Sequence, residues 1–191
     1  MKLGDFINVR TGLVFSRKQA LLGDGLYAYN ALNLKCINID GKILMESIEE
    51  FSATENLNEE CLTRRGDVLL RLSTPYTATL IGEGEVELLV PSHFAIMRSG
   101  RMVDPRYLCW WLTKNRKMFY RSASGSSTMG TISSGYIADM DFAPPTLEVQ
   151  ERIGELLDLK GKEQHLLALL AEKKQQLIDG AINEILMKEN L

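Results

Sequence analysis

The sequence predicts an α+β protein, with a mixed, β-rich domain over residues 1–145 and a long helix over residues 146–191. Short β-rich runs separated by turn residues fill most of the first hundred residues. Two prolines, Pro144 and Pro145, follow a strand-like segment. From Leu147 to about Met187 there is no proline, and apolar residues recur at spacings of three and four.

The β-rich part is predicted from apolar runs bounded by turn chemistry. Asp40-Gly41 lies between isoleucines in CINIDGKILM, which is a strong short-range hairpin signal. GDVLLRLS (66–73) opens with a turn and becomes a strand. Three further short strands are expected in TATLIG (77–82), EVELLV (85–90) and HFAIMR (93–98). Together these runs predict a compact sheet or a barrel-like core.

The pattern changes after residue 100. Asp104 followed by Pro105 is a good helix start, and apolar residues at helical spacing predict a helix over 105–120. SASGSSTMGTISSG (122–135) is predicted to be a polar loop. YIADMDF (136–142) is predicted to be a half-buried strand, because apolar and acidic residues alternate in it.

The two prolines mark the joint between domain and helix. They cannot donate ladder hydrogen bonds, so they end the strand. Thr146 is the expected N-cap, and Glu148 adds negative charge to the first turn. About 40 helical residues at roughly 1.5 Å each make a rod of about 60 Å. Gly154, Gly161 and Gly180 weaken this helix, and Gly161 is the first candidate for a break.

So long a helix cannot bury its apolar stripe on a small domain along its whole length. It either folds back on itself, packs against its own domain, or meets a second chain. Lys160 and Lys174 fall at seam positions, which argues against a plain parallel zipper. The residues predicted to form a dimer or partner interface are Ile153, Leu156, Leu167, Leu170, Leu177 and Ile185.

Composition places the chain among soluble globular proteins. It has 191 residues, 45% of them hydrophobic and 25% charged, and its formal net charge is −3. That acidic balance argues against nucleic-acid binding, which usually appears as a basic excess. No signal peptide and no membrane span are expected from the sequence. The cysteines, Cys36, Cys61 and Cys109, show no CxxC spacing, so a reducing cytoplasm is expected and a zinc site or disulfide framework is not.

The sequence offers little that resembles catalytic chemistry. The histidines, His93 and His165, lie far apart, and His93 is expected to be structural. Asp139 and Asp141 are expected to solubilise a strand rather than to bind metal. Residues 143–146 (APPT) resemble the NPPY motif of adenine methyltransferases, but they lack the Asn and the aromatic residue that hold a flipped base. The prediction is therefore a chain that is not an enzyme and carries no cofactor or metal.

The segment DFAPPTLEVQERIGELLDL (141–159) resembles the hallmark motif of the DNA-specificity (S) subunits of Type I restriction-modification systems. In that family a target-recognition domain ends in a strand, a PLPPLxEQxxI motif follows, and a long conserved helix begins. The matching positions here are Pro144, Pro145, Leu147, Glu148, Gln150 and Ile153.

Four other pieces match the family in order and distance. LGDF with Thr11-Gly12 resembles its opening strand and turn, and residues 65–69 resemble its GDVL strand. Residues 104–112 resemble its xPxYLxxxL helix, and Ser124 to Ser133 resembles its SGSxxxxIS loop. Two features depart from the pattern. The GDVL strand continues as RLSTPYTATLIG, and there is one domain and one helix where many S subunits have two of each.

The resemblance implies a target-recognition domain over 1–145 and a conserved spacer and dimerisation helix over 146–191. It implies that the helix pairs as an antiparallel coiled coil in a twofold homodimer. Each chain would bind one half of a bipartite site in double-stranded DNA and dock modification (methyltransferase) subunits, and a restriction subunit can join. S-adenosylmethionine and ATP are then expected on the partner subunits, and no membrane is involved.

Charge is unevenly spread, as DNA binding requires. Residues 46–60 contain six acids and no base, whereas residues 98–121 contain seven bases and one acid, Asp104. A second basic set comprises Arg17, Lys18, Arg64, Arg65 and Arg71. The residues predicted to contact DNA are Arg17, Lys18, Arg71, Ser73, Tyr76, Lys114, Lys117, Arg121, Ser124 and Ser126.

Two other functions fit the sequence. The chain could be an orphan S-like protein that pairs with S or modification subunits and alters or blocks their specificity without reading DNA, which the acidic balance favours. It could also be a dimeric structural protein that functions through its long coiled helix alone. Selection on random DNA separates the first alternative from a recognition role.

Overall fold

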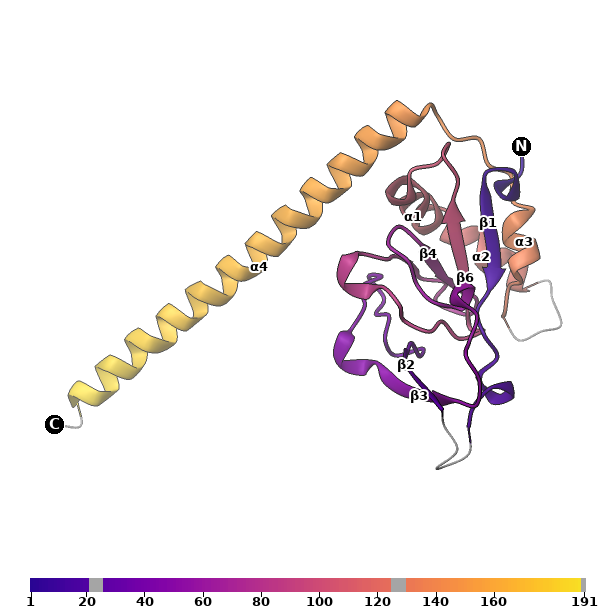
Figure 1. The fold of residues 1–191 in the computed structure, drawn as a ribbon. Helices are drawn as coiled ribbons and strands as arrows, with labels where there is room; N and C mark the ends of the chain where they lie inside the picture. Colours follow the sequence, from indigo (N-terminus) through magenta and orange to yellow (C-terminus); the bar gives the residue numbers. More distant parts are fainter. Residues whose placement is uncertain (21–25, 125–129, 190–191) are drawn as a thin grey trace. The chain divides into compact units, whose positions relative to one another are not determined.

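The computed structural model describes residues 1–20, 26–124 and 130–189 (Figure 1). The chain divides into two compact units, Met1–Glu151 and Arg152–Leu191. The first unit is α+β with antiparallel sheets, and the second is helical, which confirms the predicted fold class.

The main sheet of the first unit has four antiparallel strands in the order β1-β6-β4-β5. The strands are β1 (Ile7–Thr11), β4 (Val68–Arg71), β5 (Ala78–Leu80) and β6 (Phe94–Ser99). The central pair, β4 and β6, is buried on both faces, and Leu69 pairs with Ile96 in its register. This explains why both strands read as continuous apolar runs rather than alternating ones.

A second, two-stranded sheet pairs β2 (Tyr27–Ala31) with β3 (Glu49–Ala53). Leu89 joins it to the rest of the unit through isolated bridges to Ala31 and Leu62. The prediction of a strand over 85–90 is therefore wrong. Residues of this segment are buried, but they make only isolated bridges. The described part of this unit also has five 3-10 turns: η1 (Leu3–Asp5), η2 (Phe15–Arg17), η3 (Met45–Ser47), η4 (Glu59–Cys61) and η5 (Glu83–Glu85).

The predicted turn at Asp40-Gly41 is present, with a single bridge between Ile37 and Ile43 on either side of it. The backbone N–H of Asn38 donates to the Lys42 carbonyl at 3.1 Å. Gly41 has φ +80°, and a Cβ there would lie 2.4 Å from the Ala78 carbonyl oxygen. Glycine is thus required both by its backbone conformation and by the close approach of β5.

The predicted helix over 105–120 is two helices, α1 (Pro105–Lys114) and α2 (Arg116–Ser124). The predicted cap is confirmed, because an Asp104 carboxylate oxygen accepts from the Arg106 backbone N–H at 2.7 Å. The break falls at Asn115, whose side-chain amide donates to the Trp111 carbonyl at 2.9 Å. An asparagine side chain that binds local backbone in this way competes with helix continuation.

The predicted strand over 136–142 is wrong. Its first residues belong to a short helix, α3 (Ser134–Ala138), whose N-cap Ser133 accepts from the Tyr136 N–H at 3.1 Å. The alternating pattern instead reflects an extended segment along the N-terminus, where Lys2 and Asp141 form one isolated bridge. Phe142 donates its backbone N–H to the Met1 carbonyl at 3.0 Å, and its ring is buried.

The long helix is confirmed as α4 (Leu147–Glu189), which begins directly after Thr146. Its 43 residues correspond to about 64 Å at 1.5 Å per residue. It continues through Gly161, the first candidate for a break, without interruption. In the described structure it is a single helix, and its pairing into a coiled coil remains a proposal.

Gln150, one of the motif residues at the start of α4, has a structural role. Its side chain is 1% exposed and makes three hydrogen bonds within the first unit. The amide oxygen accepts from the Asp104 N–H at 3.1 Å, and the amide nitrogen donates to the Met102 and Pro145 carbonyls at 3.1 and 2.9 Å. This one side chain ties the first turn of α4 to the segment that caps α1.

Replacing Gln150 by alanine is expected to lower the free energy of unfolding by about 2–3 kcal/mol, because buried backbone groups lose their partners. Urea denaturation followed by circular dichroism measures this. The matched change Gln175→Ala lies on the exposed part of α4 and is expected to cost less than about 0.5 kcal/mol. Equal effects of the two substitutions would contradict the role assigned to Gln150.

Candidate nucleic-acid interface

Exposed cations gather where α1 ends and α2 begins. Lys114, Lys117 and Arg121 are exposed and Arg116 is partly exposed; we call these four residues the basic turn. Lys117 and Arg121 are four residues apart on one helix and therefore lie on the same face. Within the described part of the chain, no carboxylate forms an ion pair with any of the four. The basic turn is thus available to an external anion.

Two other cations among residues 98–121, Arg98 and Arg106, form ion pairs within the protein. The Arg98 side chain is 17% exposed and bonds Asp67 Oδ1 at 3.0 Å and Glu60 Oε2 at 2.7 Å. It also donates to the Leu62 carbonyl at 2.8 Å. Arg106 bonds the capping carboxylate of Asp104 at 2.6 Å. Counting bases in the sequence therefore overstates the cations that can reach a ligand.

The capping carboxylate of Asp104 illustrates how these pairs act. Burial would raise the pKa of this group, but hydrogen bonds from the Arg106 side chain and backbone outweigh that effect and hold the pKa below its usual range. The group is therefore ionised at neutral pH and serves as both helix cap and arginine partner.

Tyr76 was predicted to contact DNA, and the structure contradicts this. Its side chain is 1% exposed, and its hydroxyl donates to the Gly130 carbonyl at 2.5 Å. Its ring packs against Tyr120 and Phe119 with centroids 4.9 and 5.9 Å apart. Tyr76 therefore anchors the turn between β4 and β5 to α2, and its ring cannot stack on a base.

Arg71 and Ser73 lie at the end of β4, next to that anchor. Both are partly exposed, and Arg71 Nε donates to Ser73 Oγ at 3.3 Å. A second Arg71 nitrogen lies 3.5 Å from the Leu34 carbonyl oxygen. Ser73 forms a bridge to Thr131. Through Tyr76, the structure brings these two predicted residues close to α2.

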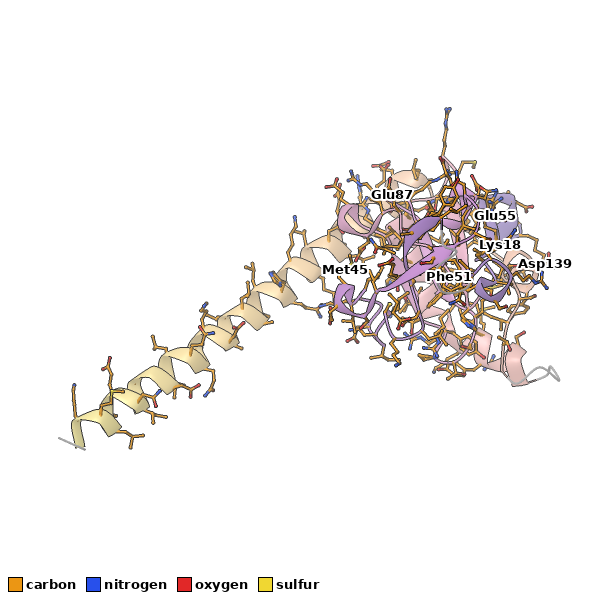
Figure 2. All side chains as sticks on the ribbon, turned by 60° about the horizontal axis from the view of Figure 1, so that its bottom comes forward. Lys18, Met45, Phe51, Glu55, Glu87 and Asp139 are labelled. Carbon is orange, nitrogen blue, oxygen red and sulfur yellow. The ribbon has the colours of Figure 1, made fainter. Side chains whose placement is uncertain are left out.

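Arg17 and Lys18 lie elsewhere, at η2 beside the two-stranded sheet. Arg17 is exposed, and Lys18 forms an ion pair with Glu55, toward which it points (Figure 2). Arg64 and Arg65 are likewise paired, with Glu60 and Glu83. Exposed pairs of this kind contribute little stability, so a phosphate can replace any of these three carboxylates. The second basic set is therefore dispersed and not a single patch.

The two remaining predicted contacts are serines after α2. Ser124 is the last residue of that helix. Ser126 falls in 125–129, outside the described residues. Neither prediction is tested by the structure.

A cavity of about 480 Å³ lies beside the two-stranded sheet. Phe15 and Phe51 contribute apolar wall, and their ring centroids are 4.5 Å apart. Its polar lining mixes both signs of charge and consists of Gln19, Asn33, Lys35, Glu49, Glu50, Ser92 and His93. Glutamates in the lining make this cavity unsuited to a phosphate group.

The groups that could do covalent or metal chemistry are not assembled. Burial raises the pKa of the Cys36 and Cys61 thiols, and it raises the pKa of Cys109 to about 11. All three thiols are therefore protonated at neutral pH and poor nucleophiles. Among residues 1–20, 26–124 and 130–189, no cluster of three metal-binding side chains occurs. His93 and His165 are both exposed, on different units.

The predicted interface residues of α4 are mostly exposed. Leu156, Leu167, Leu170, Leu177 and Ile185 expose between 51% and 77% of their surface, and Ile153 is partly buried. Leucine and isoleucine in one helical stripe are seldom left in water along a whole helix. The apolar stripe of α4 is therefore exposed in the single chain.

No helix in the described part of the chain is long and apolar enough to cross a membrane. No protein-family model matches the sequence, and no curated protein matches it. Similarity appears only when solved structures are compared with the fold.

Three of the solved structures that are similar to this chain are S subunits or come from a type I R-M system. The HsdS subunit from Thermoanaerobacter tengcongensis is 16% identical with a TM-score of 0.59, over 85% of this chain and 37% of that one. A chain from a structure on complex assembly and conformational transition of the type I R-M system is 15% identical with a TM-score of 0.61, over 92% and 45%. The S subunit of a Type I restriction-modification system from M. genitalium is 10% identical with a TM-score of 0.53, over 85% and 38%.

These comparisons confirm the fold that the motif suggested. The chain has the fold of Type I restriction-modification S subunits, over most of its length. It spans less than half the length of each of those three chains.

Proposed function

We propose that this chain is a DNA sequence-recognition (specificity) subunit of a Type I restriction-modification complex. The observation that carries the proposal is that the fold match covers 85–92% of the chain, at TM-scores of 0.53 to 0.61. The motif spanning Pro144 to Ile153 supports it independently, because the motif rests on the sequence alone.

In this proposal the first unit binds one half of a bipartite site in double-stranded DNA. The basic turn supplies exposed cations that suit phosphate contacts, which position a protein on the duplex without reading its sequence. The net charge of −3 is compatible with this role, since cations need only be placed together locally. Acids such as Glu60 and Asp67 are held in internal pairs and do not weaken the basic turn.

The second unit is proposed to pair with the same helix of another chain as an antiparallel coiled coil. A symmetric dimer of this kind would hold two recognition units on two half-sites, so the bound sequence would be an inverted repeat. The spacing of the half-sites would follow from the length of α4.

Partners supply the chemistry in this proposal. Modification subunits would dock on the chain and carry S-adenosylmethionine, and a restriction subunit that uses ATP can join them. The chain itself would be a non-enzymatic adaptor that works in the cytoplasm. The second structural match, a chain from a structure on assembly of the type I R-M system, supports assembly with such subunits.

A second function, favoured by the acidic net charge, is an S-like protein that pairs with S or modification subunits and changes their specificity without reading DNA. Selection on random DNA separates this function from the recognition role. The full chain is incubated with a random duplex library, alone and with the modification subunit of a Type I system from the same cell. We expect enrichment of a bipartite inverted repeat. Absence of enrichment in both arms would favour the second function.

A further inference from the structure

The topology of the main sheet brings four strand ends together. The strand order is β1-β6-β4-β5 and every neighbouring pair is antiparallel (Figure 1). The C-terminal ends of β1 and β4 therefore lie at the same end of the sheet as the N-terminal ends of β5 and β6. The segment 130–134 joins this end through the bridge between Ser73 and Thr131. We call this end of the sheet the polar sheet end. It is defined by Thr11, Arg71, Ser73, Thr74, His93 and Thr131.

The polar sheet end has no acidic residue. Its segments, 11–13, 71–77, 91–93 and 130–134, contain no Asp or Glu, although the chain has 25 of them. Thr11, Thr74, His93 and Thr131 are exposed there. Hydroxyls, an imidazole and a guanidinium are groups that bind base edges. Glu49 and Glu50 of β3 line the cavity beside Ser92 and His93, so the carboxylates near this end of the sheet come from another segment.

These segments are fixed to one another by backbone bonds. Leu72 donates its N–H to the His93 carbonyl at 2.9 Å, and Ile132 donates to the Leu72 carbonyl at 2.8 Å. Thr11 Oγ1 lies 3.0 Å from Ser134 Oγ. The buried side chain of Tyr76 fixes the turn between β4 and β5 by donating a hydrogen bond to the Gly130 carbonyl. The side chains of the polar sheet end are therefore presented by a rigid support, which favours selective binding over adaptable binding.

Arg71 differs from the structural arginines of the same unit. Arg98 and Arg106 are held by carboxylates, whereas the two bonds of Arg71 go to neutral oxygens at 3.3 and 3.5 Å. A guanidinium has five N–H donors, so donors remain for a ligand. Bidentate donation from arginine to O6 and N7 of guanine is the commonest specific contact in the major groove.

The basic turn lies next to the polar sheet end, because Tyr76 of the β4–β5 turn touches Tyr120 of α2. A surface with cations on one side and hydrogen-bonding groups on the other matches a duplex, whose phosphates flank its base edges. Resting on the proposed function, we propose that the polar sheet end reads base edges in the major groove. Arg71 reads a guanine, Ser73 and His93 read its neighbours, and the basic turn binds phosphate.

The test repeats the random duplex selection with single variants of the full chain, Arg71→Ala, Arg71→Lys and His93→Ala. Arg71→Ala is expected to lower the preference for guanine at one position of each half-site by roughly tenfold to a hundredfold, with the other positions retained. Arg71→Lys keeps the charge but not the bidentate fork, and it is expected to restore little of that preference. The control Arg101→Ala follows the far end of β6 and should leave the motif unchanged.

The outcomes separate this inference from the proposed function. A wild-type motif that all three variants reproduce would overturn the role of the polar sheet end and leave the recognition function standing. A wild-type chain that selects no motif, with or without the modification subunit, would overturn both. If thermal melting shows that Arg71→Ala does not fold, Arg71→Lys and the exposed His93→Ala decide the question.

Discussion

Glutamate at both Leu170 and Leu177 is expected to convert dimers of this chain into monomers at micromolar concentration. Both leucines are exposed in the single chain, at 51% and 77%, and lie seven residues apart on one stripe of α4. Burying a leucine contributes about 1.5–3 kcal/mol, and a twofold dimer would lose four of them. Association should therefore weaken by about 10⁴-fold or more, which light scattering and sedimentation can measure.

The matched control is Gln176→Glu with Asn183→Glu. These residues have the same spacing of seven but lie on another face of the helix, about a third of a turn from the two leucines at 100° per residue. The control adds the same number of carboxylates and is expected to leave the dimer intact. A wild-type chain that is monomeric at these concentrations, or a leucine variant that keeps the dimer mass, would contradict the proposed pairing.

The features that the sequence predicted well are those set by local chemistry. The start of α4 at Leu147 follows from Pro144, Pro145 and Thr146, and the cap of α1 follows from Asp104 and Pro105. Each of these depends on backbone geometry within a few residues, so a single sequence carries enough information.

The failures occurred where tertiary packing decides. Met140 and Phe142 alternate with acids as in a strand, yet they are buried because their extended segment lies along the N-terminus. The break at Asn115 depends on one side-chain bond to Trp111, which periodicity cannot reveal. Gly161 lowers helix propensity without ending the helix, since propensity alone rarely overrides forty favourable neighbours.

The candidate interface was predicted only in part for the same reason. The sequence shows where cations occur but not which carboxylates hold them, so Arg98 counted as a surface base although it bonds Asp67 and Glu60. Tyr76 was predicted to contact DNA, but its side chain is buried. The acid-free segments at 71–77 and 91–93 are visible in the sequence, but only the strand order shows that they meet.

Reversing the charge of Lys117 and Arg121 together is expected to weaken DNA binding roughly hundredfold at about 0.1 M salt. Both side chains are exposed on one face of α2, and each would lose a phosphate contact and gain a repulsion. The slope of log affinity against log salt should become shallower by about 0.9 for each lost phosphate. Fluorescence anisotropy on the selected duplex over a range of salt concentrations measures both quantities.

The sequence preference of that variant should stay the same, because phosphate contacts carry no base information. The matched control reverses Lys42 and Arg101, which are also exposed but lie outside the basic turn. Each reversal subtracts two charges, so both variants change the net charge from −3 to −7. A general effect of net charge would weaken both variants equally, which would remove α2 from the interface. Selective weakening of the Lys117 and Arg121 variant, with its motif preserved, would assign phosphate binding to the basic turn.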